Sequence, residues 1–144
     1  MAVLKKELQD QIDELINLGN EIWENDKPSY FDLLLEAWDL YPIPKNNWNE
    51  AYSLAKELFD AYIIEEDYVN AQKWLNEMIS HNNNLNLFDF DLEHNEAKYH
   101  FETGNYQTAL DKWKYVLKNA GKRYFENEKA EYLEFYKNPE KYIK

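Results

Sequence analysis

The stretch from Glu96 to Trp113 decides the fold of this chain; it reads EAKYHFETGNYQTALDKW. Gly104 and Asn105 divide it, and both residue types favour the tight turns at which one helix ends and the next begins. In the second half, the small Ala109 stands four positions before the large Trp113, so both lie on one helix face. The pattern predicts two antiparallel helices joined by a short turn.

Outward from this hairpin, apolar residues recur at three- and four-residue steps along most of the chain, which predicts amphipathic helices. We expect breaks at 25–29, where Pro28 disfavours helix at Lys27 and Ser29 caps the next helix. Further breaks are expected at Pro42-Ile43-Pro44, at 65–67, and at the polar run 81–84. The breaks leave three hairpins, over about residues 3–41, 47–80 and 88–119.

A last helix is expected over about residues 122–136, after Gly121. In one interpretation it caps the apolar end of the third hairpin. In the other, its second aromatic face, with Tyr124 and Phe135, docks a partner or forms a homodimer seam. The sequence thus predicts an all-α fold with residues 1–144 in one domain, a right-handed solenoid of three helical hairpins plus a C-terminal capping helix.

The three hairpins overlay on one another. Each second helix carries a residue followed four positions later by a large apolar one; the pairs are Tyr30 with Leu34, Ala71 with Leu75, and Ala109 with Trp113. The steps of 41 and 38 residues exceed the period of roughly 34 of one common helical repeat. We place the extra residues around 42–47 and 81–85.

These residues resemble the tetratricopeptide repeat. One repeat is matched by Ala97, Gly104, Asn105, Tyr106, Ala109, Trp113 and Leu117, and a second by Asp67, Tyr68, Ala71 and Leu75, with Glu66 in place of the turn glycine. The first hairpin departs more, since Gly19 sits one residue too close to Tyr30 and Tyr30 stands where alanine is usual. The resemblance implies stacked hairpins that bind proteins on a concave side lined by the first helix of each pair.

A narrower resemblance involves Pro42-Ile43-Pro44 with Trp48, Leu87-Phe88, Gly104-Asn105, and Gly121 with Phe125, Glu128, Tyr132 and Phe135. This set is similar to small bacterial tetratricopeptide proteins that are often encoded beside secreted polymorphic toxins. It implies an immunity protein that binds and blocks a cognate toxin. The alternative is a secretion chaperone or general scaffold that holds a client peptide.

Charge and composition exclude several other classes. The net charge is −12, from 16 basic and 28 acidic residues, which predicts no nucleic-acid partner and no anionic membrane surface. The acidity either steers a basic protein partner or only maintains solubility. The chain has no cysteine, and no run approaches the ~18 apolar residues of a membrane span. We therefore expect a cytoplasmic protein without cofactor or metal, either a monomer or a weak homodimer.

Catalysis has one candidate region. The densest polar cluster comprises Asp89, Asp91, Glu93, His94, Glu96 and His100. Glu96 and His100 stand four apart on one helix face, as in a carboxylate–histidine pair, but the His-Glu-x-x-His pattern of zinc hydrolases is absent. We therefore expect no enzyme, and keep catalysis by this cluster as the alternative.

The helical phase of the first helices predicts the partner-binding residues on the concave face. Trp23 and Phe101 are expected as exposed aromatic anchors in a wet, acidic groove that suits a basic toxin domain. The full set is Asp13, Asn20, Trp23, Lys56, Asp60, Asp91, His94, Lys98, Phe101 and Glu102.

Overall fold

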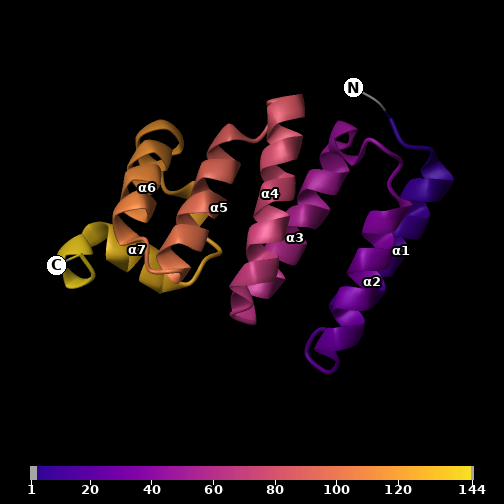
Figure 1. Cartoon of the computed structure of the whole chain (residues 1–144), viewed down its shortest axis with the longest axis horizontal. Coiled ribbons are helices and arrows are strands. Elements are labelled where there is room, and N and C mark those ends of the chain that lie inside the picture. Colours follow the sequence, from indigo (N-terminus) through magenta and orange to yellow (C-terminus); the bar gives the residue numbers. More distant parts are fainter. Residues whose placement is uncertain (1–2, 144) are drawn as a thin grey trace.

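A computed structural model describes residues 3–143, and within them every regular element is helical. The α-helices are α1 (Lys6–Ile22), α2 (Lys27–Leu40), α3 (Asn49–Ile64), α4 (Tyr68–Leu85), α5 (Asp89–Glu102), α6 (Tyr106–Ala120) and α7 (Ala130–Lys137). Consecutive helices pair as α1 with α2, α3 with α4 and α5 with α6, and the three pairs stand side by side along the long axis (Figure 1). The all-α prediction is therefore confirmed.

The three hairpins share one register. The residue just before each second helix is a carboxylate or amide: Asp26, Asp67 and Asn105. Four residues further on, the overlaid positions are all at most 4% exposed: Tyr30, Ala71 and Ala109. The turns of the second and third hairpins also match, because Glu66 (φ 57°) and Gly104 (φ 85°) both adopt the left-handed conformation. Glycine adopts it without strain, whereas Glu66 does so at some cost.

Two expected breaks differ from the structure. Ser29 does not cap α2; the Asp26 carboxylate accepts from the Ser29 backbone N–H at 3.1 Å, and Pro28 lies in the first helical turn, where no backbone donor is needed. The break expected at 81–84 is also absent, since α4 continues to Leu85 and ends at left-handed Asn86. Burial explains this, because His81 is fully buried and its two ring nitrogens lie 2.8 and 3.0 Å from the carbonyl oxygens of Glu77 and Lys45.

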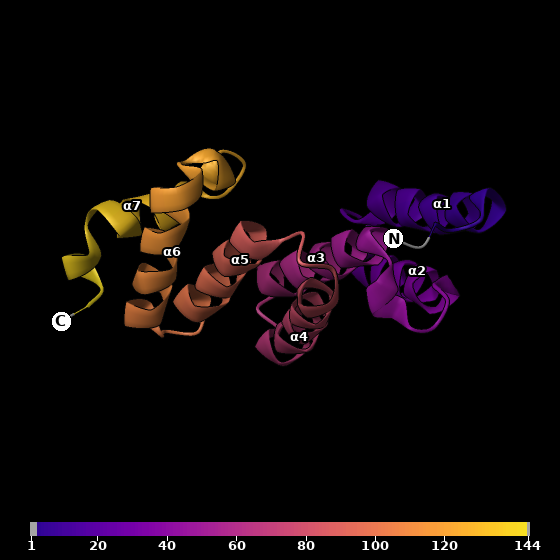
Figure 2. The ribbon, with the colours of Figure 1, turned by 90° about the horizontal axis from the view of Figure 1, so that it is seen from above.

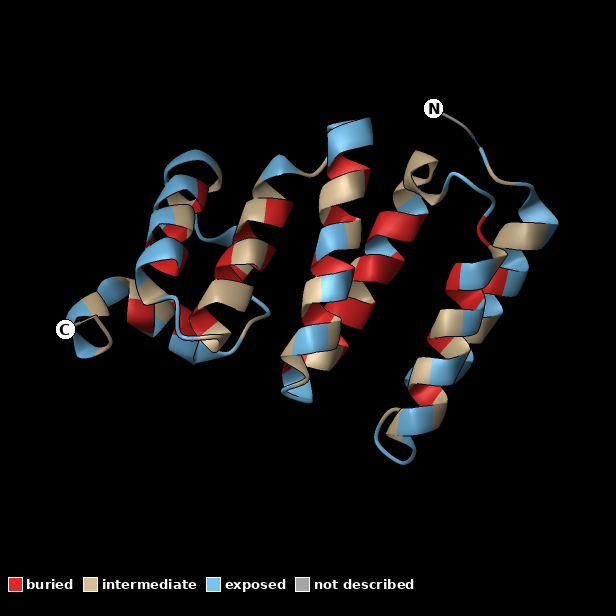
Figure 3. Ribbon diagram, viewed as in Figure 1, coloured by how far each residue is buried: buried red, intermediate tan, exposed pale blue. Residues whose placement is uncertain are grey.

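Buried residues occur on each of the three helix pairs (Figure 3), and the apolar ones form two clusters. One cluster joins α1 to α4 and reaches Leu92 of α5, and a second joins α5, α6 and the C-terminal segment. Gly19 allows the close approach of α1 to α2, since a Cβ there would lie 2.5 Å from Leu34 Cδ1. Within residues 3–143, no helix has the length and apolar character needed to cross a bilayer.

The prediction of a single helix over residues 122–136 is wrong. The segment contains a 3₁₀ turn (Arg123–Phe125), an irregular stretch at 126–129, and then α7. Lys129 is extended (φ −63°, ψ 144°), and the preceding Glu128 side chain contacts buried groups of α5 instead of continuing a helix surface. Tyr132 and Phe135 of α7 still cover the third hairpin, with ring centroids 5.4 and 5.1 Å from Phe101.

Candidate functional site

One face of the stack carries three adjoining hollows, which we call the inner groove. The first hollow, of about 250 Å³, is lined by Asn20, Trp23, Tyr30, Glu57, Asp60, Ala61 and Ile64. The middle hollow, of about 370 Å³, shares Asp60 and Ile64 with it and adds Ile63, Lys98, Asn127, Glu128, Lys129 and Tyr132. The third, of about 290 Å³, includes Lys56, Asp60, Asp91, His94, Lys98, Arg123 and Glu128. Figure 2 shows α1 and the segment after α6 on either side of α3 and α5.

Most of the predicted site residues line this groove. Asn20, Trp23 and Asp60 line the first hollow. The third hollow contains the others: Lys56, Asp60, Asp91, His94 and Lys98. The helical phase of α1, α3 and α5 was thus sufficient to predict that these seven residues lie on one face.

Three predicted residues lie elsewhere. Asp13 is exposed on α1 and accepts a hydrogen bond from Gln9 at 2.8 Å. Glu102 lies at the edge of the middle hollow, where it pairs with Lys129 at 2.6 Å and accepts from the Tyr132 hydroxyl at 2.7 Å. The expectation of Phe101 as an exposed anchor is wrong. It is 4% exposed, because the C-terminal segment packs its aromatic rings over it.

A buried ammonium ion lies at the centre of the groove. Lys98 is 4% exposed, and its Nζ lies 2.7 Å from Asp60 Oδ1 and 2.8 Å from Glu128 Oε2. Burial alone would lower the pKa of Lys98, but the two carboxylates outweigh it and raise that pKa. Lys98 therefore stays charged, and it ties α5 to α3 and to the 126–129 stretch.

The geometry around His94 fixes its tautomer. The Trp113 indole N–H donates to His94 Nδ1 at 3.0 Å, and an indole nitrogen can only donate. His94 Nδ1 must therefore accept, which leaves the proton on Nε2. That Nε2 donates to Glu128 Oε2 at 2.7 Å. His94 is thus a neutral link between the core Trp113 and the groove carboxylate Glu128.

Both carboxylate oxygens of Asp91 also have partners within the chain. Lys56 of α3 lies 2.7 Å from its Oδ1, and the Tyr52 hydroxyl donates to its Oδ2. Asn95 donates to the Asp91 backbone carbonyl at 2.8 Å. The carboxylate therefore joins α3 to α5 rather than standing free for a partner.

These ion pairs change the expected charge of the groove. The third hollow holds three acidic residues (Asp60, Asp91, Glu128) and three basic ones (Lys56, Lys98, Arg123), which sum to zero. The middle hollow holds Asp60 and Glu128 against Lys98 and Lys129, which also sum to zero. The first hollow holds Glu57 and Asp60 and is lined by no lysine or arginine. The acidic groove that the sequence predicted is thus acidic only at the α1–α3 end.

Sequence reasoning missed several groove residues, among them Glu57, Ile64 and Glu128. Glu57 lies one helical turn before Asp60, so the same phase argument could have identified it. Glu128 could not have been predicted, because the sequence indicated a continuous helix over this segment and not the turn that directs Glu128 inward.

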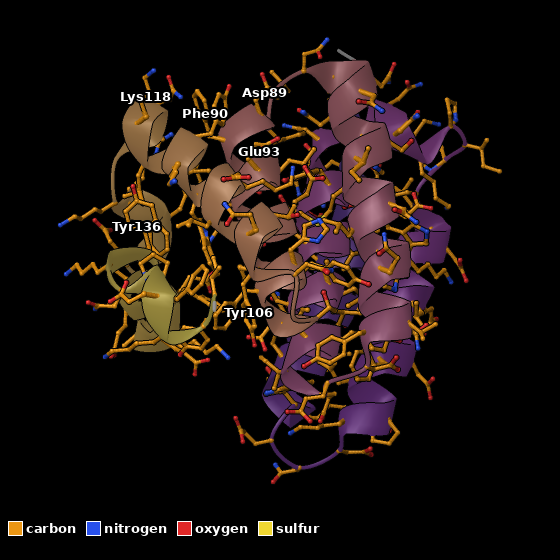
Figure 4. The ribbon with its side chains drawn as sticks, turned by 60° about the vertical axis from the view of Figure 1, so that its left-hand side comes forward. Asp89, Phe90, Glu93, Tyr106, Lys118 and Tyr136 are labelled. Carbon is orange, nitrogen blue, oxygen red and sulfur yellow. The ribbon has the colours of Figure 1, made fainter. Side chains whose placement is uncertain are left out.

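The polar cluster considered for catalysis is divided between two sides of α5. Asp91 and His94 face the groove. On the other side, Asp89 accepts from Asn82 at 2.8 Å, and Lys112 lies 3.5 Å from Glu93 and 3.7 Å from Glu96. Asp89 and Glu93 are labelled in Figure 4. Within residues 3–143, no group of three or more His, Asp or Glu side chains is placed to hold a metal ion.

We compared the chain with protein-family models, with curated proteins and with solved structures, and none of the three comparisons gives a match.

The contacts of Glu128 predict that the free energy of unfolding falls at acidic pH. Burial alone would raise the pKa of Glu128, but its hydrogen bond from His94 and the charge of Lys98 lower it from 4.5 to about 2. Because the folded pKa is depressed, the stabilisation is complete above pH 4.5 and is lost as the pH falls towards 2. A Glu128→Gln variant lacks this titration. The difference in unfolding free energy between wild type and variant, measured by urea denaturation, should shrink over this range; a constant difference would contradict the assignment.

Proposed function

We propose that this chain is a protein-binding module that uses the inner groove, and most concretely an immunity protein that occludes a cognate toxin. The observation that carries the proposal is the continuity of the groove. Asp60 and Ile64 join the first hollow to the middle one, and Lys98 and Glu128 join the middle hollow to the third. One partner surface could therefore contact side chains from all three hairpins at once.

The groove also has the composition of an interaction surface. Ile64 is 65% exposed between the first two hollows, and the ring of Trp23 is half-buried beside it. Apolar and aromatic groups at the centre of a polar surface are typical of binding hot spots. The ion pairs of Lys98 and Lys56 hold the surrounding carboxylates in place before a partner arrives, which lowers the entropic cost of binding.

A chaperone or scaffold that holds an extended client segment is the second candidate. It is favoured by the linear course of the groove across α1, α3 and α5. The two candidates differ in what is bound, since an immunity protein recognises a folded toxin domain and a chaperone recognises an unfolded client.

The experiment that tests the proposal starts from the product of the gene directly upstream. We expect the two purified proteins to form a stoichiometric complex in calorimetry, and we expect deletion of this chain to kill the cell only when that neighbour is intact. Survival of the deletion strain, together with binding to the unfolded neighbour alone, would instead support the chaperone function. Absence of binding to either form would contradict both.

Ile64 and Val69 provide a matched pair of variants that locates the binding surface. Both are exposed aliphatic residues near the tip of the second hairpin, at 65% and 84%, but only Ile64 lines the groove. Ile64→Asp should weaken the complex at least about tenfold, as expected for an interface anchor. Val69→Asp makes the same charge change and should leave affinity within about twofold. Equal losses, or a larger loss for Val69→Asp, would place the interface outside the groove.

A further inference from the structure

The first hollow has mainly apolar walls. Trp23 and Tyr30 meet edge to face with their ring centroids 4.6 Å apart, and Ala61 and Ile64 of α3 add to this apolar wall. The polar lining consists of Asn20, Glu57 and Asp60. Its volume of about 250 Å³ is smaller than the ~300–1,000 Å³ typical of pockets for drug-sized ligands. The hollow therefore has the size for one side chain rather than for a whole small-molecule ligand.

Two carboxylates are placed among these apolar groups. Glu57 accepts a long hydrogen bond of 3.5 Å from the Tyr30 hydroxyl, and no ion pair to Glu57 occurs within residues 3–143. Asp60 binds Lys98 through Oδ1 at 2.7 Å, and its side chain remains 38% exposed. Burial raises the pKa of Glu57 and outweighs the hydrogen bonds from Asn20 and Tyr30, which act in the opposite direction. Among the described residues, Glu57 thus has neutral donors but no cation beside it.

Lys27, the basic side chain beside Trp23, does not fill this role. Lys27 Nζ lies 4.3 Å from the centroid of the Trp23 ring, bonds the Trp23 carbonyl at 3.4 Å and lies 4.0 Å from Glu65. It is not among the residues that line the hollow. The first hollow thus differs from the other two, in which lysine or arginine side chains balance every carboxylate.

We infer that the first hollow binds an arginine side chain of the partner, between the Trp23–Tyr30 wall and the carboxylate of Glu57. A guanidinium group is planar, stacks on aromatic rings and forms forked hydrogen bonds to carboxylates. It would supply the cation that the hollow lacks while its methylene groups contact Ile64 and Ala61. This inference rests on the proposed function, because it names the partner group that the groove recognises.

The first test needs no partner. Acetyl-glycyl-arginyl-glycinamide is titrated into the ¹⁵N-labelled protein, and the Trp23 indole N–H signal is followed after assignment with Trp23→Phe. The citrulline analogue, which is neutral and nearly isosteric, is the control. We expect a saturable shift of the Trp23 signal with the arginine peptide and at most a tenth of that shift with citrulline at equal concentration. Equal shifts, or no shift at Trp23, would overturn the inference.

The second test uses paired variants of equal charge. Glu57→Gln should abolish the Trp23 response and weaken the partner complex at least about tenfold. Glu36→Gln, on the exposed surface of α2 and outside the hollow, should leave both unchanged. Glu57→Gln should not lower the unfolding free energy, since the neutral amide replaces a carboxylate that burial disfavours.

The outcomes separate the two proposals. A partner complex of equal affinity for wild type and Glu57→Gln would overturn the arginine inference and leave the proposed function in place. Arginine-peptide binding that Glu57→Gln abolishes, without any complex with the neighbouring gene product, would support the arginine site and contradict the immunity function.

Discussion

Replacing Trp113 with alanine is expected to lower the free energy of unfolding by about 3–5 kcal/mol. Trp113 is fully buried, and its ring lies 5.4–5.9 Å from those of Phe125, Tyr132 and Phe135. Alanine would leave a cavity between the third hairpin and the segment that covers it. It would also remove the donor that His94 Nδ1 accepts from. Urea denaturation followed by circular dichroism measures the loss.

Phenylalanine variants separate the hydrogen bond from the cavity. Trp113→Phe keeps most of the ring volume but removes the donor to His94. Trp74→Phe is the matched control, because Trp74 is 2% exposed and its indole N–H makes no hydrogen bond within residues 3–143. We expect Trp113→Phe to cost about 1 kcal/mol more than Trp74→Phe, which is the worth of one buried hydrogen bond. Equal costs would contradict the assigned tautomer of His94.

Replacing Glu128 with alanine is expected to destabilise the fold by about 3 kcal/mol at neutral pH, at the lower end for breaking a buried ion pair. The change removes one of the two carboxylates that compensate Lys98, and it leaves the His94 Nε2–H without its acceptor. Part of the charge of Lys98 remains balanced by Asp60, which is why the loss stays near the lower bound. Denaturant unfolding at neutral pH measures it.

Removing the cation instead should cost less. In Lys98→Met the buried charge itself is gone, Asp60 is exposed enough to be hydrated, and Glu128 still accepts from His94. We therefore expect a loss of about 1 kcal/mol, well below that of Glu128→Ala. A larger loss for Lys98→Met than for Glu128→Ala would contradict the description of Lys98 as a buried ion held by Asp60 and Glu128.

Charge reversal at Asp60 or Glu102 is accordingly a poor probe of partner binding. The sequence suggested that both are free concave-face acids, but Asp60 pairs with Lys98 and Glu102 pairs with Lys129. Reversal would place like charges together and would affect folding and binding at once. Glu57 and Ile64 are better probes, because no ion pair to Glu57 occurs among the described residues and Ile64 is mostly exposed.

The helices and their pairing followed from local patterns. The three- and four-residue apolar steps located α1 to α6, and the Gly104 turn with its counterpart at Glu66 fixed the second and third hairpins in one register. Tyr30, Ala71 and Ala109 were matched by spacing alone, and all three are buried. These features are set by interactions within one turn or one hairpin, and such interactions are visible in a short window of sequence.

What the sequence did not reveal depends on contacts between distant segments. Asp60 and Lys98 are 38 residues apart, and His94 and Glu128 are 34 apart. Phe101 was wrongly predicted to be exposed for the same reason. The residues that cover it, Tyr132 and Phe135, lie about 30 positions later in the chain. Glu128 was unpredictable because its inward turn interrupts a continuous helix, a local structure, in exchange for contacts with Lys98 and His94 that exist only in the folded chain.

The sequence by itself determined the positions of α1 to α6, the three hairpins and the face on which α1, α3 and α5 meet, because periodicity and turn chemistry are local properties. Only the tertiary structure decided which charges on that face remain available. Ion pairs between hairpins neutralise most of the groove, and among the described residues they leave the Glu57 carboxylate of the first hollow without a cation. A carboxylate is identical in sequence whether or not a lysine from another helix lies 2.7 Å away, so its availability is a property of the fold.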